Sequence, residues 1–239
     1  MRIAMWSGPR NLSTAMMYSF GNRPDCAVVD EPFYASYLAM TGIQHPMQEE
    51  ILRSQPQDPD IVANALMGPN PDRKAHFYMK LMTHHMIPGV PRDWMKECVN
   101  VFLIRHPARV IASYGIKREN PTLEDIGFSQ QAELFDLVCS WGQDAIVIDS
   151  HDIRDDPAGM LRNLCDRIGL PFDDAMLSWP KGGHKDDGAW APHWYGSVWN
   201  STGFAGAEGA LPEVSEELEP VLDAAMPFYE KLSRVKLCG

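Results

Sequence analysis

The segment 7–14 has the composition of a loop that binds a phosphate. A short apolar run, residues 3–6, leads directly into Ser7-Gly8-Pro9-Arg10-Asn11-Leu12-Ser13-Thr14, and a helical pattern follows. At such a junction unpaired backbone N–H groups and the positive end of the helix dipole face the anion. The segment is not a Walker A loop, which would have glycine and lysine where Ser13 and Thr14 stand. The alternative is an ordinary strand-to-helix turn capped by Asn11 or Ser13.

A second cationic position follows the apolar run 99–104. This run ends in Ile104-Arg105-His106-Pro107, and Ser113 lies two helical turns further on. Ligands of open α/β sheets bind at the carboxyl ends of strands, so Arg105 and the Ser113 hydroxyl are placed to contact one anion. A P-loop kinase is expected to have a metal-holding Asp near this position, and an arginine instead indicates a phosphate bound without magnesium. The alternative is a surface arginine paired with one of the many acids.

Further candidates lie in or directly after two other apolar runs. Asp30-Glu31-Pro32-Phe33 places Glu31 at the carboxyl edge of the sheet beside the first loop; the alternative is a helix N-terminal acid favoured by the dipole. The run 77–82 contains Lys80 and leads into Thr83-His84-His85. Because side chains alternate along a strand, His84 and His85 are not expected to face one site together.

The pattern of apolar runs predicts the elements that position these residues. Five short runs are predicted strands, residues 3–6, 26–29, 77–82, 99–104 and 145–148. Helical patterns alternate with them at residues 15–20, 34–40, 91–97, 108–116, 131–141 and 158–168, and a last one covers 214–235. Continuous apolar strands suit a parallel sheet covered on both faces. We therefore predict a single domain, residues 1–239, with a three-layer α/β/α architecture and a central parallel sheet. Segment 180–204, rich in Gly, Trp and His, is a predicted loop whose aromatic side chains pack on the domain.

Composition excludes several classes of protein. With 239 residues, 45% of them hydrophobic and 22% charged, the chain is a globular protein rather than a disordered, collagen-like or coiled-coil one. A formal charge of −11 argues against nucleic acid or an anionic membrane as the main partner, although a few local cations suffice for a small anion. No run is long enough for a membrane helix, and the first residues lack the apolar stretch expected of a signal peptide. Five scattered cysteines support neither a zinc site nor a disulfide framework, which predicts a cytoplasmic location.

These residues together resemble a known enzyme family. The loop Pro9-Arg10-Asn11-Leu12-Ser13-Thr14 is similar to the loop with which sulfotransferases bind the 5′-phosphosulfate of 3′-phosphoadenosine 5′-phosphosulfate. Arg105-His106-Pro107 with Ser113 matches the spacing of that family's 3′-phosphate motif. The stretch from Ile146 to Phe172 resembles the family's late strand, its Asp-Pro turn and its Gly-Leu-Pro helix exit. Lys181-Gly182-Gly183 is similar to the basic loop that closes over the 3′-phosphate.

The resemblance implies a P-loop NTPase-like fold and a reaction. The enzyme would transfer a sulfuryl group from 3′-phosphoadenosine 5′-phosphosulfate to a hydroxyl or amine of a small-molecule acceptor, with no metal. Glu31 resembles the family's Glu-Pro base, and His84 is the second candidate for that role. Arg10 and Lys80 would stabilise the leaving phosphate and the transferring group.

Two departures from the family pattern keep other functions open. Leu12 stands where the loop usually has glycine, and Ala15 replaces the aromatic residue that stacks on adenine, so the adenine contact has no assigned residue. The alternatives are a metal-dependent P-loop kinase or NTPase, and a non-catalytic nucleotide-binding protein with a sulfotransferase-like fold. The oligomeric state and the identity of the acceptor are not predicted.

Overall fold

The computed structural model describes residues 1–115 and 121–238 and has a five-stranded parallel sheet at its centre. The strands are β1 (Arg2–Ser7), β2 (Cys26–Asp30), β3 (His76–Met82), β4 (Val99–Ile104) and β5 (Ala145–Asp149), in the spatial order β2-β3-β1-β4-β5. In this register Met5 of β1 lies opposite Lys80 on one side and Val101 on the other. The carboxyl ends of the strands therefore meet at one edge, and the predicted α/β fold with a central parallel sheet is confirmed.

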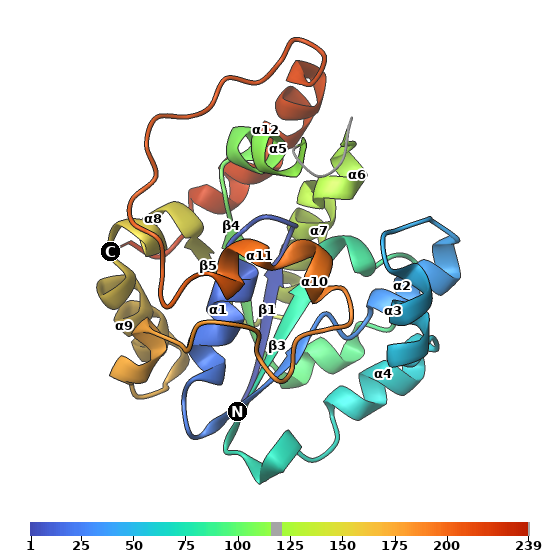
Figure 1. The fold of residues 1–239 in the computed structure, drawn as a ribbon, viewed down its shortest axis with the longest axis vertical. Coiled ribbons are helices and arrows are strands. Elements are labelled where there is room, and N and C mark those ends of the chain that lie inside the picture. Colours follow the sequence, from blue (N-terminus) through green and yellow to red (C-terminus); the bar gives the residue numbers. More distant parts are fainter. Residues whose placement is uncertain (116–120, 239) are drawn as a thin grey trace.

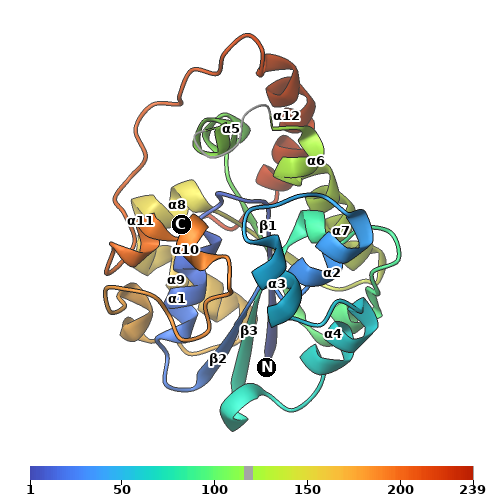
Figure 2. The ribbon, with the colours of Figure 1, turned by 45° about the vertical axis from the view of Figure 1, so that its right-hand side comes forward.

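Helices cover both faces of the sheet (Figures 1 and 2). One face carries α1 (Ser13–Gly21), α8 (Ser150–Asp155), α9 (Pro157–Ile168) and the short 3₁₀ helix η4 (Asp174–Leu177). The opposite face carries α4 (Pro59–Leu66), η3 (Asp93–Glu97), α7 (Phe128–Ser140) and α12 (Glu219–Ser233). Alternate residues of β1 enter the two cores, since Ile3 and Met5 pack on the first side and Ala4 and Trp6 on the second. Burial on both faces explains the continuous apolar runs of the sequence.

Two smaller clusters complete the architecture beside the carboxyl edge of the sheet. One joins α2 (Tyr34–Thr41) and α3 (Gln48–Ser54) to the four-residue helices α10 (Ala191–Trp194) and α11 (Gly196–Trp199). The other joins α5 (Pro107–Gly115) and α6 (Leu123–Ile126) to α12. The 3₁₀ turns η1 (Pro71–Arg73) and η2 (Thr83–His85) flank β3. These clusters place aromatic side chains and cations around the strand ends.

The structure differs from the predicted elements mainly at helix ends. The stretch 91–97 is a 3₁₀ helix from Asp93, and the last helix begins at Glu219, where Pro220 supplies the first-turn proline. The predicted loop 180–204 contains α10 and α11, as its aromatic residues fold onto α2. Ile116, the last residue of the predicted helix 108–116, lies outside the described residues.

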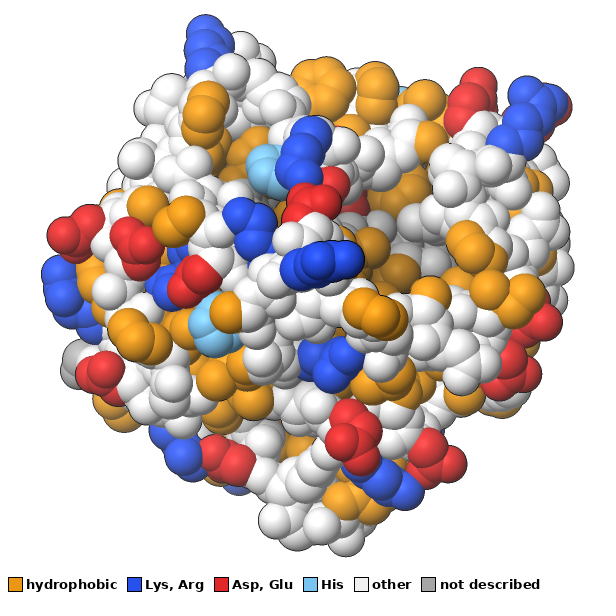
Figure 3. Space-filling view, turned by 90° about the horizontal axis from the view of Figure 1, so that it is seen from below, with side chains coloured by type: hydrophobic (Ala, Val, Ile, Leu, Met, Phe, Trp, Pro, Cys, Tyr) orange, Lys and Arg blue, Asp and Glu red, His pale blue; other side chains and the backbone are white. Residues whose placement is uncertain are grey.

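The segment between α11 and α12 follows a separate course. From 200 to 218 the chain contains no helix, and it arches along the outside of the molecule past α8 toward α12 (Figures 1 and 2). On the face seen in Figure 3, acidic and basic side chains are interspersed. None of the described helices combines the length and the apolar character that crossing a membrane requires.

Candidate active site

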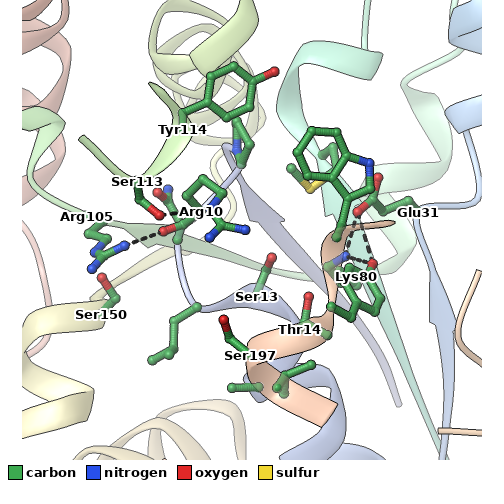
Figure 4. Close-up of a pocket in the computed structure, with 18 of the residues that line it drawn as sticks. Arg10, Ser13, Thr14, Glu31, Lys80, Arg105, Ser113, Tyr114, Ser150 and Ser197 are labelled. Atoms are coloured by element: carbon green, nitrogen blue, oxygen red, sulfur yellow. Dashed lines mark hydrogen bonds and ion pairs between the residues drawn. The ribbon is translucent and has the colours of Figure 1, made fainter. Parts of the chain in front are cut away.

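A cavity of about 400 Å³ opens at the carboxyl edge of the sheet (Figure 4). It brings together most of the candidates found in the sequence, which line it from the first loop, from the ends of β2, β3 and β4, and from α5: Pro9, Arg10, Asn11, Leu12, Ser13, Thr14, Glu31, Lys80, His84, Arg105 and Ser113. The rest of its lining is largely aromatic and hydroxyl side chains, including Tyr34, Tyr114, Ser150, Trp190, Trp194, Tyr195 and Ser197.

The loop between β1 and α1 adopts an unusual backbone conformation. Arg10 and Leu12 have φ angles of 63° and 70°, in the left-handed region that favours glycine. Leu12 occupies the position where the resembled loop has glycine, so it takes up the glycine conformation at a cost of about 1–2 kcal/mol. No side chain caps α1, and its first N–H groups are left for a ligand in the cavity.

Asn11 fastens this loop to the sheet. Its side chain is buried, and Nδ2 donates to the Leu103 carbonyl at 3.2 Å. Gln131 of α7 donates to the same carbonyl at 2.9 Å, so one backbone oxygen of β4 binds both the loop and α7. The Asn11 side chain thus holds the loop in place.

Cations and hydroxyls gather at one end of the cavity, which we call the anion end and define by Arg10, Arg105, Ser113, Ser150 and Arg154. Arg10 Nε donates to Ser113 Oγ at 2.9 Å, and Arg105 Nη1 donates to the Arg10 carbonyl at 2.7 Å. Burial and the neighbouring charge of Arg105 lower the pKa of Arg10. Positive charges therefore lie close together, as a site for an anion requires.

Two buried polar atoms at the anion end have unused hydrogen-bonding capacity. Ser150 Oγ and Arg105 Nε have no hydrogen-bond partner among the described residues. Ser150 directly follows β5, and Arg154 lies about one turn further along α8. Neither was found from the sequence, although the position of Ser150 at a strand's carboxyl end was a usable signal, because the same rule identified Arg105.

A network of buried acids and one lysine forms the other end, which we call the proton end and define by Asp30, Glu31, Lys80 and Tyr195. Lys80 Nζ donates to Glu31 Oε1 at 2.6 Å (Figure 4). It also donates to Asp30 Oδ1 at 2.8 Å and to the Tyr195 hydroxyl at 2.6 Å. The Tyr195 hydroxyl also accepts from Trp190 Nε1 at 2.9 Å and donates to Asp30 Oδ2 at 2.8 Å. All members are buried, so their charges interact in a medium of low polarity.

Burial shifts the pKa values of the groups at the proton end. It raises the pKa of Glu31, against the opposing effects of the Lys80 charge and of hydrogen bonds from Lys80 and Tyr195. Burial would lower the pKa of Lys80, but the two adjacent carboxylates outweigh it and raise that pKa. The Glu31 side chain is 10% exposed and Asp30 is 1% exposed, so Glu31 is the acid that reaches the cavity. A carboxylate that reaches a cavity and has a raised pKa is a group that can accept a proton.

The prediction that His84 and His85 cannot face one site together is wrong. The strand β3 ends at Met82, and both histidines lie in the 3₁₀ turn η2, where the alternation of a strand no longer applies. Both line the cavity, with ring centroids 4.4 Å apart. His85 stacks between Tyr34 and Tyr37, and burial holds its pKa well below the usual value. His85 is therefore neutral, and His84 remains the histidine candidate for a base.

Lys181 and Gly182 do not line the cavity. Lys181 is exposed, and the Gly182 N–H donates to the Trp199 carbonyl at 2.9 Å, which holds this turn against α11 instead of above Arg105. The segment that reaches Arg105 comes later in the chain, at residues 203–209, and contributes Glu208. No pattern in the sequence pointed to Glu208 or to Tyr195, because neither lies in a periodic stretch. Within residues 1–115 and 121–238, no three His, Cys, Asp or Glu side chains form a group able to hold a metal ion.

Comparison with known proteins gives a family for this arrangement. A family model described as "Sulfotransferase domain" matches residues 1–235. Two Arabidopsis thaliana proteins, named branched-chain-amino-acid aminotransferase-like protein 1 and protein 2, are 35% identical over 236 residues and 33% identical over 232. The alignments cover 98% and 96% of this chain but 42% and 41% of the relatives, so the chain spans about two-fifths of their length.

A solved structure shares the fold. The sulfotransferase domain from the Synechococcus PCC 7002 olefin synthase aligns with a TM-score of 0.52 at 16% identity and covers 94% of each chain. At this identity the likeness concerns the fold alone.

Proposed function

The chain belongs to the sulfotransferase domain family, and from this premise we propose that it transfers a sulfuryl group from 3′-phosphoadenosine 5′-phosphosulfate to a hydroxyl or amine of a small-molecule acceptor. The observation that carries the proposal is the pairing of the anion end with the proton end in one cavity. Donor binding and removal of the acceptor proton are the two tasks of the reaction, and each end has the chemistry for one of them.

The donor is proposed to lie along the first loop. The backbone N–H groups at the start of α1, with Ser13 and Thr14, would bind the 5′-phosphosulfate. Arg105 and Ser113 would bind the 3′-phosphate, because a guanidinium and a hydroxyl from two elements present donors to one anion.

Glu31 is the proposed general base. Its carboxylate accepts the proton of the acceptor hydroxyl while that oxygen bonds to sulfur and the bond between sulfur and the bridging phosphate oxygen breaks. The electron pair of that bond remains on the phosphate, which yields adenosine 3′,5′-bisphosphate and a sulfate ester. Lys80 and Arg10 would stabilise the negative charge that develops on the bridging oxygen and the sulfuryl group.

Calorimetry tests the donor half of the proposal. Adenosine 3′,5′-bisphosphate and magnesium ATP are titrated separately into the purified protein. We expect tight binding of the bisphosphate, unchanged by a chelator. Preference for magnesium ATP would make the protein a kinase or NTPase, and binding of neither would leave a non-catalytic protein that retains the fold.

Glu31→Gln tests the chemical half. Transfer of labelled sulfate from the donor to a panel of alcohols, phenols and amines is measured beside bisphosphate affinity. General base catalysis contributes about 10²- to 10⁴-fold, so turnover should fall by that factor while affinity stays the same. The control is Glu50→Gln, an exposed acid of α3. Unchanged turnover in Glu31→Gln would move the base role to His84, where His84→Gln repeats the measurement.

A further inference from the structure

Three arginines from different elements converge on one carboxylate, Glu208. Arg154 Nη1 of α8 lies 2.8 Å from Oε1, and Arg109 Nε of α5 lies 3.0 Å from Oε2. Arg105 also donates to Oε1. The Glu208 side chain is 1% exposed although its segment lies on the outside of the molecule. Burial alone would raise the pKa of this carboxyl, but the hydrogen bond from Arg105 and the charges of all three arginines lower it, so Glu208 is ionised at neutral pH.

The segment that carries Glu208, residues 205–210, makes few other polar contacts with the rest of the described chain. In Ala205-Gly206-Ala207-Glu208-Gly209-Ala210, Glu208 has the one side chain larger than a methyl group. Among the described residues, the polar contacts of 205–210 with the rest of the chain go to these same arginines, since Arg154 Nε donates to the Gly206 carbonyl and Arg109 Nη2 to the Gly209 carbonyl. Glycines on both sides of Glu208 give the backbone freedom to change course. The position of the segment therefore depends on these arginines, through the Glu208 ion pairs and the two carbonyl contacts.

The arginines that bind Glu208 also belong to the cavity. Arg105 and Arg154 line it, together with Ser150, whose hydroxyl has no partner among the described residues. A carboxylate offers one negative charge and two acceptor oxygens. A phosphate monoester offers close to two charges and three acceptor oxygens. A phosphate at this place could use the Ser150 hydroxyl and Arg105 Nε, which Glu208 leaves unused.

We propose that Glu208 is an internal competitor for the anion end, which the 3′-phosphate of the nucleotide displaces, so that residues 205–210 leave their position when the donor binds. The proposal rests on the proposed function, because it takes a nucleotide with a 3′-phosphate as the competing anion. Displacement of Glu208 makes binding selective. A nucleotide without a 3′-phosphate does not displace Glu208, so these arginines add nothing to its affinity.

Glu208→Gln tests this competition by calorimetry with two probes, adenosine 3′,5′-bisphosphate and adenosine 5′-monophosphate. The variant removes the competing charge and keeps the size of the side chain. We expect its affinity for the bisphosphate to rise by about tenfold or more, the scale of one charge-assisted contact, and its affinity for the monophosphate to stay the same. The control is Glu213→Gln, an exposed acid of the same segment, for which both affinities should match the wild type.

Hydrogen exchange of residues 203–210 gives a second readout on the wild-type protein. The bisphosphate should increase exchange there, and the monophosphate should leave it unchanged. A bisphosphate that binds Glu208→Gln no more tightly than wild type, or that protects 203–210, would overturn the competition and make Glu208 a fixed part of the binding site. Absence of bisphosphate binding in both proteins would overturn the proposed function as well, which keeps the two failures distinguishable.

Discussion

The two ends of the cavity use the same kinds of charged group in opposite proportions. At the anion end, Arg105 and Arg154, together with the adjacent Arg109, surround a single acid, Glu208. At the proton end, two acids surround a single cation, Lys80. An excess of cations attracts an anionic ligand, whereas an excess of buried acids raises a carboxyl pKa and creates a base. Under the proposed function, the balance of charge, more than the residue types, would separate the binding end from the end that accepts a proton.

The ends also differ in how firmly their charges are fixed. Asp30 accepts from Lys80, Tyr195 and the Gly188 N–H, so its network ties together β2, β3 and the segment 188–195. Glu208 belongs to a segment without helix or strand. The Asp30 network therefore fixes the proton end, whereas the segment that carries Glu208 can move away from the arginines of the anion end.

The largest effect is expected at the buried lysine. Lys80→Met leaves Asp30 and Glu31 buried side by side without their cation, which should lower the free energy of unfolding by about 3–5 kcal/mol. Urea unfolding measures this change. The control is Lys185→Met, which removes an exposed lysine paired with Asp72 and should cost at most about 1 kcal/mol. Similar small losses in both variants would mean that the proton end is not the rigid, low-polarity network described above.

Arg105→Ala should reduce affinity at the anion end selectively. A charge-assisted contact is worth about 1.5–3 kcal/mol, so binding of adenosine 3′,5′-bisphosphate should weaken about ten- to a hundredfold. Binding of adenosine 5′-monophosphate should change far less. Calorimetry with both nucleotides measures the two losses, and equal losses would reject the 3′-phosphate role of Arg105.

Tyr195→Phe should affect proton transfer by a smaller amount. The hydroxyl hydrogen bond to Glu31 lowers the pKa of that carboxyl, so its removal raises this pKa further. Because a base must be ionised, the acid limb of kcat/KM, already above the usual range of a glutamate, should move to higher pH. Stability should fall by about 1–3 kcal/mol, because the buried hydrogen bonds of this hydroxyl with Lys80, Trp190 and Asp30 are lost together. A variant with lower activity but an unmoved acid limb would give Tyr195 a purely structural role.

The sequence predicted correctly the features that depend on position in the sheet. The five strands are continuous apolar runs because both faces of the sheet are buried, and the confirmed family resemblance rests on residues at the strand ends. Arg105 and Glu31 were found because each directly follows a strand at the carboxyl edge. Their location, though not their chemical role, could be read from this rule.

Residues outside that pattern could not be found in this way. Glu208 pairs with Arg105 across 103 residues, and Tyr195 meets Lys80 across 115. Both lie where no periodicity constrains the backbone, and tertiary packing alone decides which strand end they reach. The short match at Lys181 shows the same limit. A basic residue followed by glycines does not predict the hydrogen bond from Gly182 to the Trp199 carbonyl, which holds this turn against α11.

Backbone strain is the feature that the two ends share, and it gives the smallest expected effect. Arg10, at the anion end, has a φ of 63°, and Leu12 in the same loop has a φ of 70°; Glu31, at the proton end, has a φ of 39°. In Leu12→Gly, relief of about 1–2 kcal/mol is opposed by the lost packing of a partly buried side chain and by the freedom of glycine in the unfolded state. The net change in unfolding free energy should therefore stay within about 1 kcal/mol.

Leu12→Val separates the two contributions, because it keeps an apolar side chain but is β-branched, which the left-handed region disfavours most. Urea unfolding should rank Leu12→Val below both wild type and Leu12→Gly, with Leu12→Asn, which tolerates this conformation, between glycine and valine. If valine were as stable as leucine, the loop backbone would have another conformation open to it. The anion end would then be flexible in its loop as well as in the segment that carries Glu208.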